Sequence, residues 1–214
     1  MKRSLLFLLV VLFSIQSFPQ LLSTNPNFPL ESSDPLIITM DATKGNNGLL
    51  SYTPTSDVYV HIGAITNFST SSSDWKYVKF TWATTNPLAQ AAYLGSNKWS
   101  YTITGGLRSF FGIVNPAETI QKIAILFRNG SGSLKQANTD GSDMYLQVYT
   151  SGLAARLNAP PKQPTYIPQP EPILKIVGDN IAMTGVSSIP ATLKLYFNGA
   201  VVQTALSATT ISAN

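Results

Sequence analysis

The sequence offers few residues for acid-base, nucleophilic or metal chemistry. His61 is the only histidine, and the chain has no cysteine, which excludes thiol chemistry, disulfides and cysteine-based metal sites. No nucleophile-elbow sequence accompanies His61, so a Ser/His/Asp arrangement is not indicated. Hydrolysis of a glycosidic bond usually needs two carboxylates at a fixed separation. The three glutamates, Glu31, Glu118 and Glu171, fall in a leader, a turn and a linker, so only aspartates could form such a pair. We predict no catalytic residues within this chain.

One polar loop has oxygen ligands of the kind that calcium prefers. Asn138, Asp140, Ser142 and Asp143 lie within six consecutive residues, NTDGSD. The glycine stands at the fourth position of this motif, and no glutamate follows at the closing position of a calcium loop. The other interpretation is an Asx-rich turn that satisfies its own backbone. We expect no cofactor, and a Ca²⁺ ion at this loop is the alternative.

The clearest signal is for binding. Residues 57–82 contain two runs in which apolar and polar residues alternate, joined by a Ser/Thr-rich connection. Alternation predicts two β-strands whose successive side chains point to opposite faces. The expected inward set is Val58, Val60, Ile62, Val78, Phe80 and Trp82, and the expected outward set is Tyr59, His61, Trp75, Tyr77, Lys79 and Thr81.

Outward aromatic side chains beside a histidine suit a sugar ligand. A sugar ring has an apolar C–H face that stacks on exposed aromatics, while polar neighbours bind its hydroxyl groups. Trp75 and Tyr77 near His61 would form such a face. The alternative is that loops or another domain bury these aromatics and that His61 is a structural histidine. The pattern alone leaves both interpretations open.

The composition indicates an all-β extracellular protein. Only 11% of the 214 residues are charged, while hydrophobic residues make up 44% and include three Trp, nine Tyr and ten Phe, enough to fill a core. The formal charge of +4 includes Lys2 and Arg3 of the N-terminal segment, and about +2 remains without them. So small a charge predicts neither a nucleic acid nor an anionic membrane as partner.

The first twenty residues read as a secretory signal peptide. Lys2 and Arg3 precede an apolar run from Leu5 to Phe13, and polar residues follow up to Gln20. The run is about half of the roughly 20 residues that span a bilayer, so we expect no membrane span after signal removal. The predicted location is secreted or cell-surface, in the extracellular or periplasmic space.

The remaining chain predicts two β domains. Residues 21–34 are a flexible leader, and residues 35–156 are expected to form an immunoglobulin-like antiparallel β-sandwich. A linker with six prolines spans 157–172, and residues 173–214 are expected to be an incomplete second β-sandwich. The expected strands are 36–40, 98–103 with Trp99 in the core, 122–129, 144–149, 173–177, 181–184, 192–197 and 200–205, with a helical turn at 115–119 and a hairpin turn at Asn198-Gly199.

Several motifs resemble those of known starch-binding modules. VYVHIG at 58–63, SDWKYV at 73–78 and FRNGSGSLKQANTDGSDMYLQVY at 127–149 together resemble the β-sandwich modules of carbohydrate-binding families 25 and 26. With MDATKGNNGLL at 40–50, the chain is similar to the N-terminal region of secreted α-amylase-family enzymes, glycoside hydrolase family 13. The resemblance implies a non-catalytic α-glucan-binding module that targets a catalytic domain, lying further along the same polypeptide, to polysaccharide.

The resemblance also implies which residues contact the glucan. His61 matches the family's strand histidine and Trp75 its platform tryptophan, while Asn129, Asn138 and Asp140 match hydrogen-bonding positions of the loop. Leu134 stands where the family pattern has a loop tryptophan, and Tyr77 or Tyr145 could replace that wall. The alternative function is a purely structural spacer, packing against a catalytic or cell-surface partner without binding sugar.

Overall fold

The protein is all-β, with antiparallel sheets and almost no helix. The computed structural model describes residues 20–160 and 175–214, so the predicted signal peptide, apart from Gln20, and residues 161–172 of the predicted linker lie outside the described residues. Every pairing between named strands is antiparallel. The strands are β1 (Leu22–Asn25), β2 (Leu36–Asp41), β3 (Val58–Thr66), β4 (Ala92–Gly95), β5 (Lys98–Ile103), β6 (Ile120–Asn129), β7 (Lys135–Gln136), β8 (Met144–Gln147), β9 (Ala155–Ala159), β10 (Met183–Phe197) and β11 (Ala200–Ala213).

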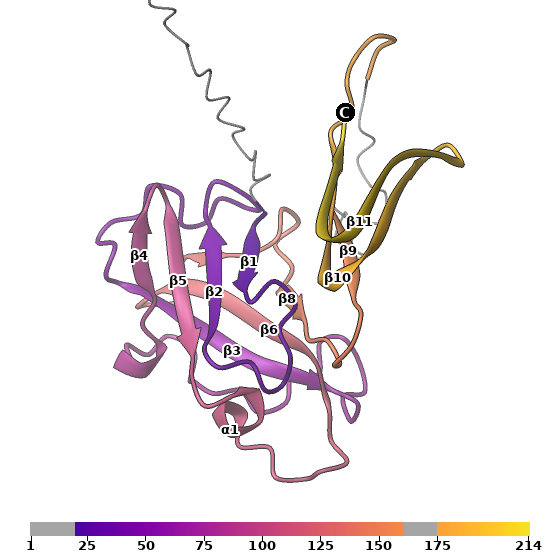
Figure 1. The fold of residues 1–214 in the computed structure, drawn as a ribbon. Coiled ribbons are helices and arrows are strands. Elements are labelled where there is room, and N and C mark those ends of the chain that lie inside the picture. Colours follow the sequence, from indigo (N-terminus) through magenta and orange to yellow (C-terminus); the bar gives the residue numbers. More distant parts are fainter. Residues whose placement is uncertain (1–19, 161–174) are drawn as a thin grey trace, which may run out of the picture.

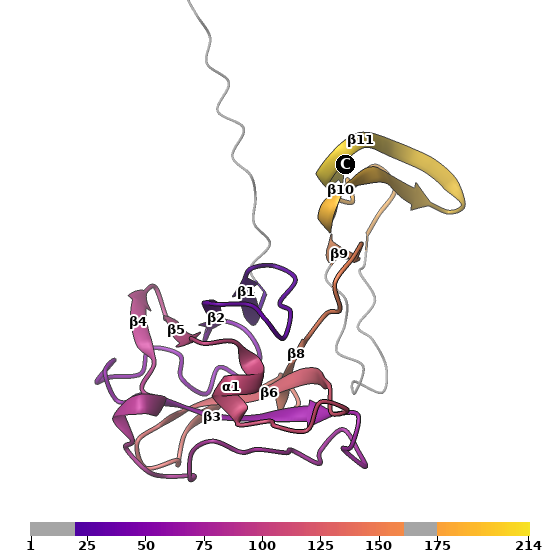
Figure 2. The ribbon, with the colours of Figure 1, turned by 60° about the horizontal axis from the view of Figure 1, so that its bottom comes forward.

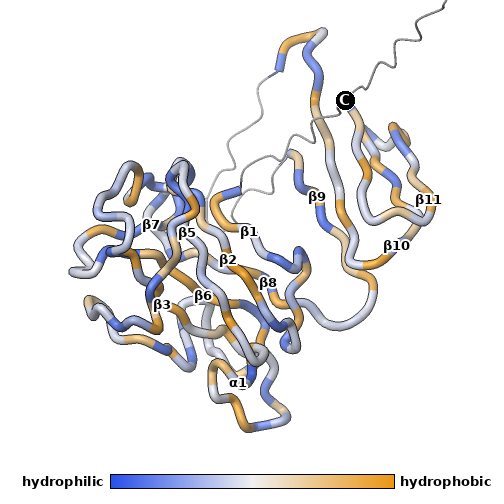
Figure 3. Tube along the Cα trace, turned by 60° about the vertical axis from the view of Figure 1, so that its left-hand side comes forward, coloured by the Kyte–Doolittle hydropathy of each residue, from blue (hydrophilic) through white to orange (hydrophobic). Residues whose placement is uncertain are grey.

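Two sheets form the body of the molecule. The first has the order β1-β2-β5-β4, and the second has the order β3-β6-β7, with β8 also paired to β6. Figures 1 and 2 show them as two layers, and hydrophobic residues concentrate on strands such as β2 and β6 (Figure 3). Alternate side chains of both sheets meet in one core. Its fully buried members include Leu36, Ile38, Met40, Trp99, Ile103, Val58, Val60, Ile62, Ile123, Ile125 and Phe127.

The second alternating run of the 57–82 stretch is not a regular strand. Lys76 exchanges two backbone hydrogen bonds with Ala64, both 2.8 Å, and the Lys79 amide then donates to the Ile62 carbonyl at 2.9 Å. Three residues on one side therefore match two on β3, which is the register of a β-bulge. Tyr77 lies in this bulge with a φ of 54°. We call residues 75–84 the covering segment, because they run along β3.

The bulge and the turn that follows change which side chains of this run are inward. Phe80 is buried at 6% exposure, as predicted. Val78 and Trp82, both predicted inward, are 46% and 36% exposed. The extra residue interrupts the period-two alternation between Lys76 and Phe80, and the chain turns after Phe80, so alternation does not describe Val78 or Trp82. Tyr59, predicted outward, is 9% exposed, and the guanidinium of Arg128, its cross-strand partner, lies over its ring.

Other boundaries also differ from the sequence predictions. Leu22–Asn25, within the predicted flexible leader, form β1 and pair with β2. The 115–119 segment is a turn without a helix, whereas the short helix α1 (Leu107–Phe111) forms between Gly106 and Gly112. Both termini of this helix are glycines with positive φ, which other residues adopt at a cost. A 3-10 turn spans Pro87–Ala89.

The C-terminal part is a separate three-stranded sheet of order β11-β10-β9. The predicted hairpin turn at Asn198-Gly199 is confirmed, with φ values of 48° and 80°. Residues 157–159, predicted to begin the linker, belong to β9, and 175–177, predicted as a strand, are irregular. Figure 1 shows this sheet beside the two-layered body. No helix among the described residues is long and apolar enough to cross a membrane.

Replacing Trp99 by Ala should lower the free energy of unfolding by about 3–5 kcal/mol, because a large aromatic side chain leaves a cavity in the core. Trp99 is fully buried, and its Nε1 donates to the Thr55 carbonyl at 2.9 Å. Leu88→Ala is the control, since Leu88 is 76% exposed, and its change should stay within about 0.5 kcal/mol. Urea denaturation measures both, and equal losses would contradict the assignment of Trp99 to the core.

Candidate functional site

The covering segment pairs with the edge of β3 at Ala64, and the outer face of the second sheet carries most of the aromatic side chains predicted for binding. Opposed residues of antiparallel strands share a face, and the register places Gly63, Ala124 and Tyr145 in one row across β3, β6 and β8. His61 lies on the same face of β3, two residues before Gly63. Gly63 and Ala124 are small and Tyr145 is large. The two small residues leave space for another side chain on this face, beside His61, and we call this space the trough.

Trp75 fills this trough. A Cβ atom added to Gly63 would lie 3.3 Å from Cε3 of Trp75 and 3.1 Å from the Lys76 carbonyl oxygen, so a larger residue would push the indole or the Lys76 backbone outward by a few tenths of an ångström. The Trp75 Nε1 donates to the hydroxyl of Tyr145 at 3.2 Å, and these two rings meet edge to face with centroids 6.3 Å apart. Trp75 is thus partly buried and held at both ends of its indole.

His61 stacks on Trp75. The ring centroids are 5.6 Å apart with an interplanar angle of 28°. The Nδ1 of His61 lies 2.9 Å from the Phe80 carbonyl oxygen. Because a carbonyl oxygen only accepts, Nδ1 carries the proton, and Nε2 of the neutral ring is an acceptor. Nε2 has no hydrogen-bond partner in the part of the chain that the structure describes, and it is not among the buried unpaired atoms, so solvent reaches it.

The protonation of His61 depends on its burial. Desolvation lowers the pKa of the imidazole most strongly, and the positive charge of Arg128 lowers it further. The hydrogen bond to the Phe80 carbonyl and the charge of Asp143 act in the opposite direction. The net result is a pKa below the usual 6.5, which keeps the ring neutral and Nε2 available as an acceptor at neutral pH.

Trp82 also contacts His61. Its ring is perpendicular to the imidazole, with centroids 5.2 Å apart and an interplanar angle of 86°. A Cβ atom added to Gly132 would lie 2.5 Å from the Trp82 Nε1, and Gly132 has a φ of 72°. Only glycine fits there for both reasons. The covering segment and the 129–134 loop therefore meet at Trp82.

Arg128 holds Trp82 in this position. Its guanidinium carbon lies 5.6 Å from the ring centroid of Trp82 and 5.5 Å from that of Tyr59, distances at which a cation is attracted to an aromatic face. The same group donates to four backbone carbonyls, those of Thr84 at 2.6 Å, Asn129 at 2.9 Å, Gly130 at 3.1 Å and Thr81 at 3.5 Å. Arg128 is fully buried, and burial lowers its pKa.

We call His61, Trp75, Trp82 and Tyr145 the aromatic face. Trp75 is nearly parallel to His61 and Trp82 is nearly perpendicular to it, so the two indoles are steeply inclined to each other. The face combines apolar ring surface with one open acceptor, Nε2 of His61. This combination of surfaces suits a partly apolar ligand that has hydroxyl groups. No group of three or more His, Cys, Asp or Glu residues that could hold a metal occurs in residues 20–160 and 175–214.

Of the six residues predicted for sugar binding, the structure brings His61 and Trp75 together. The hydroxyl of Tyr77 instead donates to Glu118, which also accepts from Thr66 at the end of β3. Tyr77 therefore lies apart from His61.

The other three predicted residues organise their own loops. Asn129 is 7% exposed and holds the 129–134 loop through bonds to Ser131, Ser133 and the Leu134 amide. Asn138 is 8% exposed and donates to the Ser142 and Asp143 carbonyls. Asp140 is exposed and accepts from the amide and hydroxyl of Ser142, which is the geometry of an Asx turn.

Sequence reasoning missed Trp82 and Arg128. Trp82 was placed in the core by extending the alternation, although the following Ala-Thr-Thr-Asn-Pro, residues 83–87, is rich in turn formers and signals the end of the extended run. Arg128 occupies a strand and has no carboxylate partner in the sequence nearby, so only its contacts reveal its role. Tyr145 is one of the two residues predicted to substitute for the loop tryptophan of the family, and it contacts Trp75.

A large cleft lies elsewhere, between the first sheet and the C-terminal sheet. Its volume is about 810 Å³, and its lining includes Thr39, Lys98, Arg156, Asn158 and Thr210. The Nε of Arg156 and the Oδ1 of Asn158 are unpaired. Both atoms are closed off from solvent, however, so a ligand in the cleft would not reach them. We therefore place the candidate site on the aromatic face.

Comparison with known proteins adds no assignment. No family model matches the chain, and a search of curated proteins finds no match.

The free energy of unfolding should fall as the pH is lowered from about 8 to about 5. The pKa of His61 is lower in the folded protein than its usual 6.5, so the unfolded chain takes up the proton first as the pH falls through that value. The stability contributed by the neutral His61 is fully present above pH 6.5 and is lost as the pH falls below that value. Urea denaturation at both pH values measures the effect, and His61→Gln should show a smaller difference. An equal pH dependence in the variant would contradict a neutral, buried imidazole.

Proposed function

We propose that the aromatic face binds an α-glucan such as starch, as a non-catalytic module of a secreted α-amylase-family glycoside hydrolase. The observation that carries the proposal is the cluster of Trp75, His61 and Trp82, two indoles flanking an imidazole whose Nε2 is an open acceptor. Indole surfaces stack on the apolar faces of sugar rings, and the acceptor binds a hydroxyl group. The location expected for such a protein is secreted or cell-surface.

The inclination of the two indoles favours an α-glucan over a flat polymer. A β-1,4-linked glucan is a flat ribbon, and it stacks best on coplanar aromatic rings. An α-1,4-linked glucan is a curved helix in which successive sugar rings are tilted. Because Trp75 and Trp82 stand at nearly parallel and nearly perpendicular angles to the same imidazole, they complement a curved chain.

In this proposal Trp82 takes the place of the loop tryptophan of carbohydrate-binding families 25 and 26. The resemblance to those families puts Leu134 at that position of this chain. Trp82 contacts Gly132 of the 129–134 loop, the loop that bears a tryptophan in those families. Leu134 itself is 42% exposed. A tryptophan from the covering segment therefore stands in contact with this loop, and the platform regains a second indole from a different part of the chain.

The expected mechanism is concentration of a tethered enzyme on its polymer. A single weak site is sufficient: a millimolar dissociation constant corresponds to about −4 kcal/mol. Tethering converts the next encounter between catalytic domain and polymer into an intramolecular one. In this proposal the two sheets around one core form an immunoglobulin-like β-sandwich, and the partners are the α-glucan and a catalytic domain in the same polypeptide.

Trp75→Ala and Trp82→Ala should each weaken binding to soluble starch at least about tenfold, or about 1.4 kcal/mol, because each removes one stacking surface. Affinity electrophoresis through gels that contain starch measures retardation, and gels with a soluble β-1,4-linked glucan test the preference. Phe68→Ala is the control, since Phe68 is a 49% exposed aromatic outside the face, and it should not change retardation.

Migration of the wild-type protein without retardation in starch gels would refute the proposal and favour the structural spacer. The spacer function also predicts that Trp75 fluorescence becomes protected from quenching when a downstream domain is present. Equal retardation by both polymers would refute the argument from the indole angles while leaving sugar binding intact.

A further inference from the structure

Tyr77 has a backbone conformation that needs an external support. Its φ of 54° is in the left-handed region, which is unfavourable for a bulky side chain and is worth explaining wherever it occurs. The residue forms the bulge of the covering segment, directly after the paired Lys76 and two residues after Trp75. Any relaxation of this φ toward negative values would therefore move the backbone that carries Trp75.

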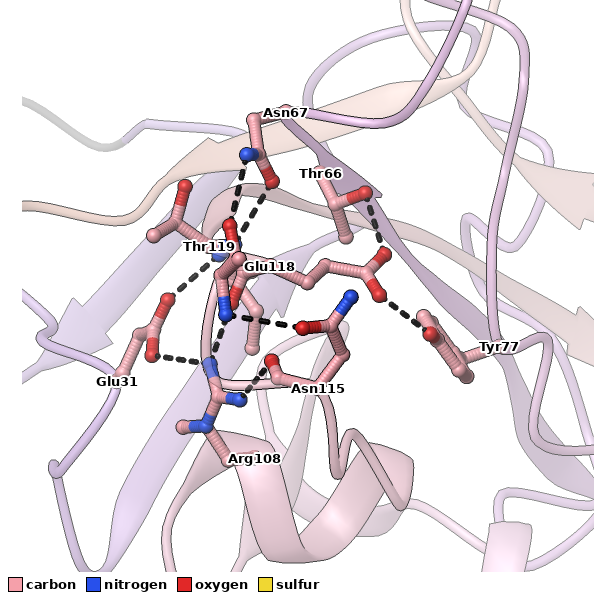
Figure 4. A network of polar contacts seen from close by, with 10 residues as sticks. Glu31, Thr66, Asn67, Tyr77, Arg108, Asn115, Glu118 and Thr119 are labelled. Carbon is pink, nitrogen blue, oxygen red and sulfur yellow. Dashed lines mark hydrogen bonds and ion pairs between the residues drawn. The ribbon is translucent and has the colours of Figure 1, made fainter.

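The support is the carboxylate of Glu118. The Tyr77 hydroxyl donates to Oε2 of Glu118 at 2.6 Å, and the Thr66 hydroxyl donates to Oε1 at 2.7 Å. Figure 4 shows the carboxylate between these two hydroxyls. Glu118 is only 4% exposed, and hydrogen bonds to a charged acceptor are about twice as strong as neutral ones. The same bond raises the pKa of Tyr77, so the phenol remains a donor.

Glu118 is itself fixed by the surrounding loop. Arg108 of helix α1 donates to the Glu118 carbonyl and, at 3.2 Å, to the Glu31 carboxylate. The other oxygen of Glu31 accepts from the Ile120 amide at 2.6 Å. Figure 4 shows that these contacts continue from Glu31 through Arg108 to the segment that carries Glu118. These bonds hold the backbone of Glu118 against helix α1 and the start of β6, and so they restrict the position of its carboxylate.

We infer that Tyr77 and Glu118 are positioning residues for the aromatic face: their hydrogen bond holds the bulge in its left-handed conformation, and the bulge places Trp75 over Gly63 and against His61. This role differs from the direct sugar contact predicted for Tyr77 from the sequence. It rests on the proposed function only in its consequence for glucan binding. The effect on the geometry of Trp75 stands independently.

The test is Tyr77→Phe, which keeps the ring and removes the hydroxyl. Because His61 is the only histidine, its ring protons give isolated NMR signals, and their ring-current shift reports the stack with Trp75. We expect the His61 signals to move and starch affinity to fall about three- to tenfold. Tyr196→Phe, a 57% exposed tyrosine in β10, is the matched control and should change neither.

Glu118→Gln provides the second variant, and it should move the His61 signals in the same direction. In the double variant the two effects should not add, because both act through one hydrogen bond. Unchanged His61 signals and unchanged affinity in Tyr77→Phe, even with a lower melting temperature, would overturn the inference and leave Tyr77 a merely stabilising residue. If the wild-type protein does not bind starch, the proposed function fails, while a shift of the His61 signals still supports the positioning role.

Discussion

The close backbone approach of the covering segment to β3 is the constraint on which the candidate site depends. Lys76 pairs with Ala64 through two hydrogen bonds of 2.8 Å, and the Trp75 ring approaches Gly63 closely. A larger side chain at Gly63 would meet both the Lys76 carbonyl and the Trp75 ring. The absence of a side chain at Gly63 therefore leaves the space in which the indole of Trp75 packs. In that position the indole stacks on His61.

Two buried charges hold the two ends of this segment by different means. Arg128 has backbone carbonyls and aromatic faces around it, and Glu118 has two hydroxyl donors. A buried charge is costly unless its hydrogen-bonding capacity is used. Each charge therefore requires its partners to stay in place: the loops on either side of Trp82 for Arg128, and Tyr77 and Thr66 for Glu118. The aromatic face is therefore held in one arrangement, and preorganisation of this kind reduces the entropy that a site loses when a ligand binds.

Sequence patterns predicted the regular strands well and the covering segment poorly. In β2, β5 and β6 the alternation of apolar residues reflects a core on one side, and Trp99 is buried as predicted. β1 was missed because LSTN has no alternation, and its strand character comes from pairing with β2. Alternation predicts Val78 and Trp82 inward because it reveals neither a bulge nor a turn, and these interrupt the period of two at Tyr77 and after Phe80.

The sequence by itself determined the all-β fold class, the hairpin turn at Asn198-Gly199 and the proximity of His61 and Trp75, because these follow from local periodicity, turn chemistry and residue type. Only the tertiary structure decided that Trp82 joins them, that Tyr77 serves as a support, and that Asn129 and Asn138 hold their own loops. These roles depend on contacts between residues far apart in the chain, such as Tyr77 with Glu118 and Trp82 with Gly132. Such contacts are set by strand register and by the space left at small residues, and neither is encoded in any local stretch.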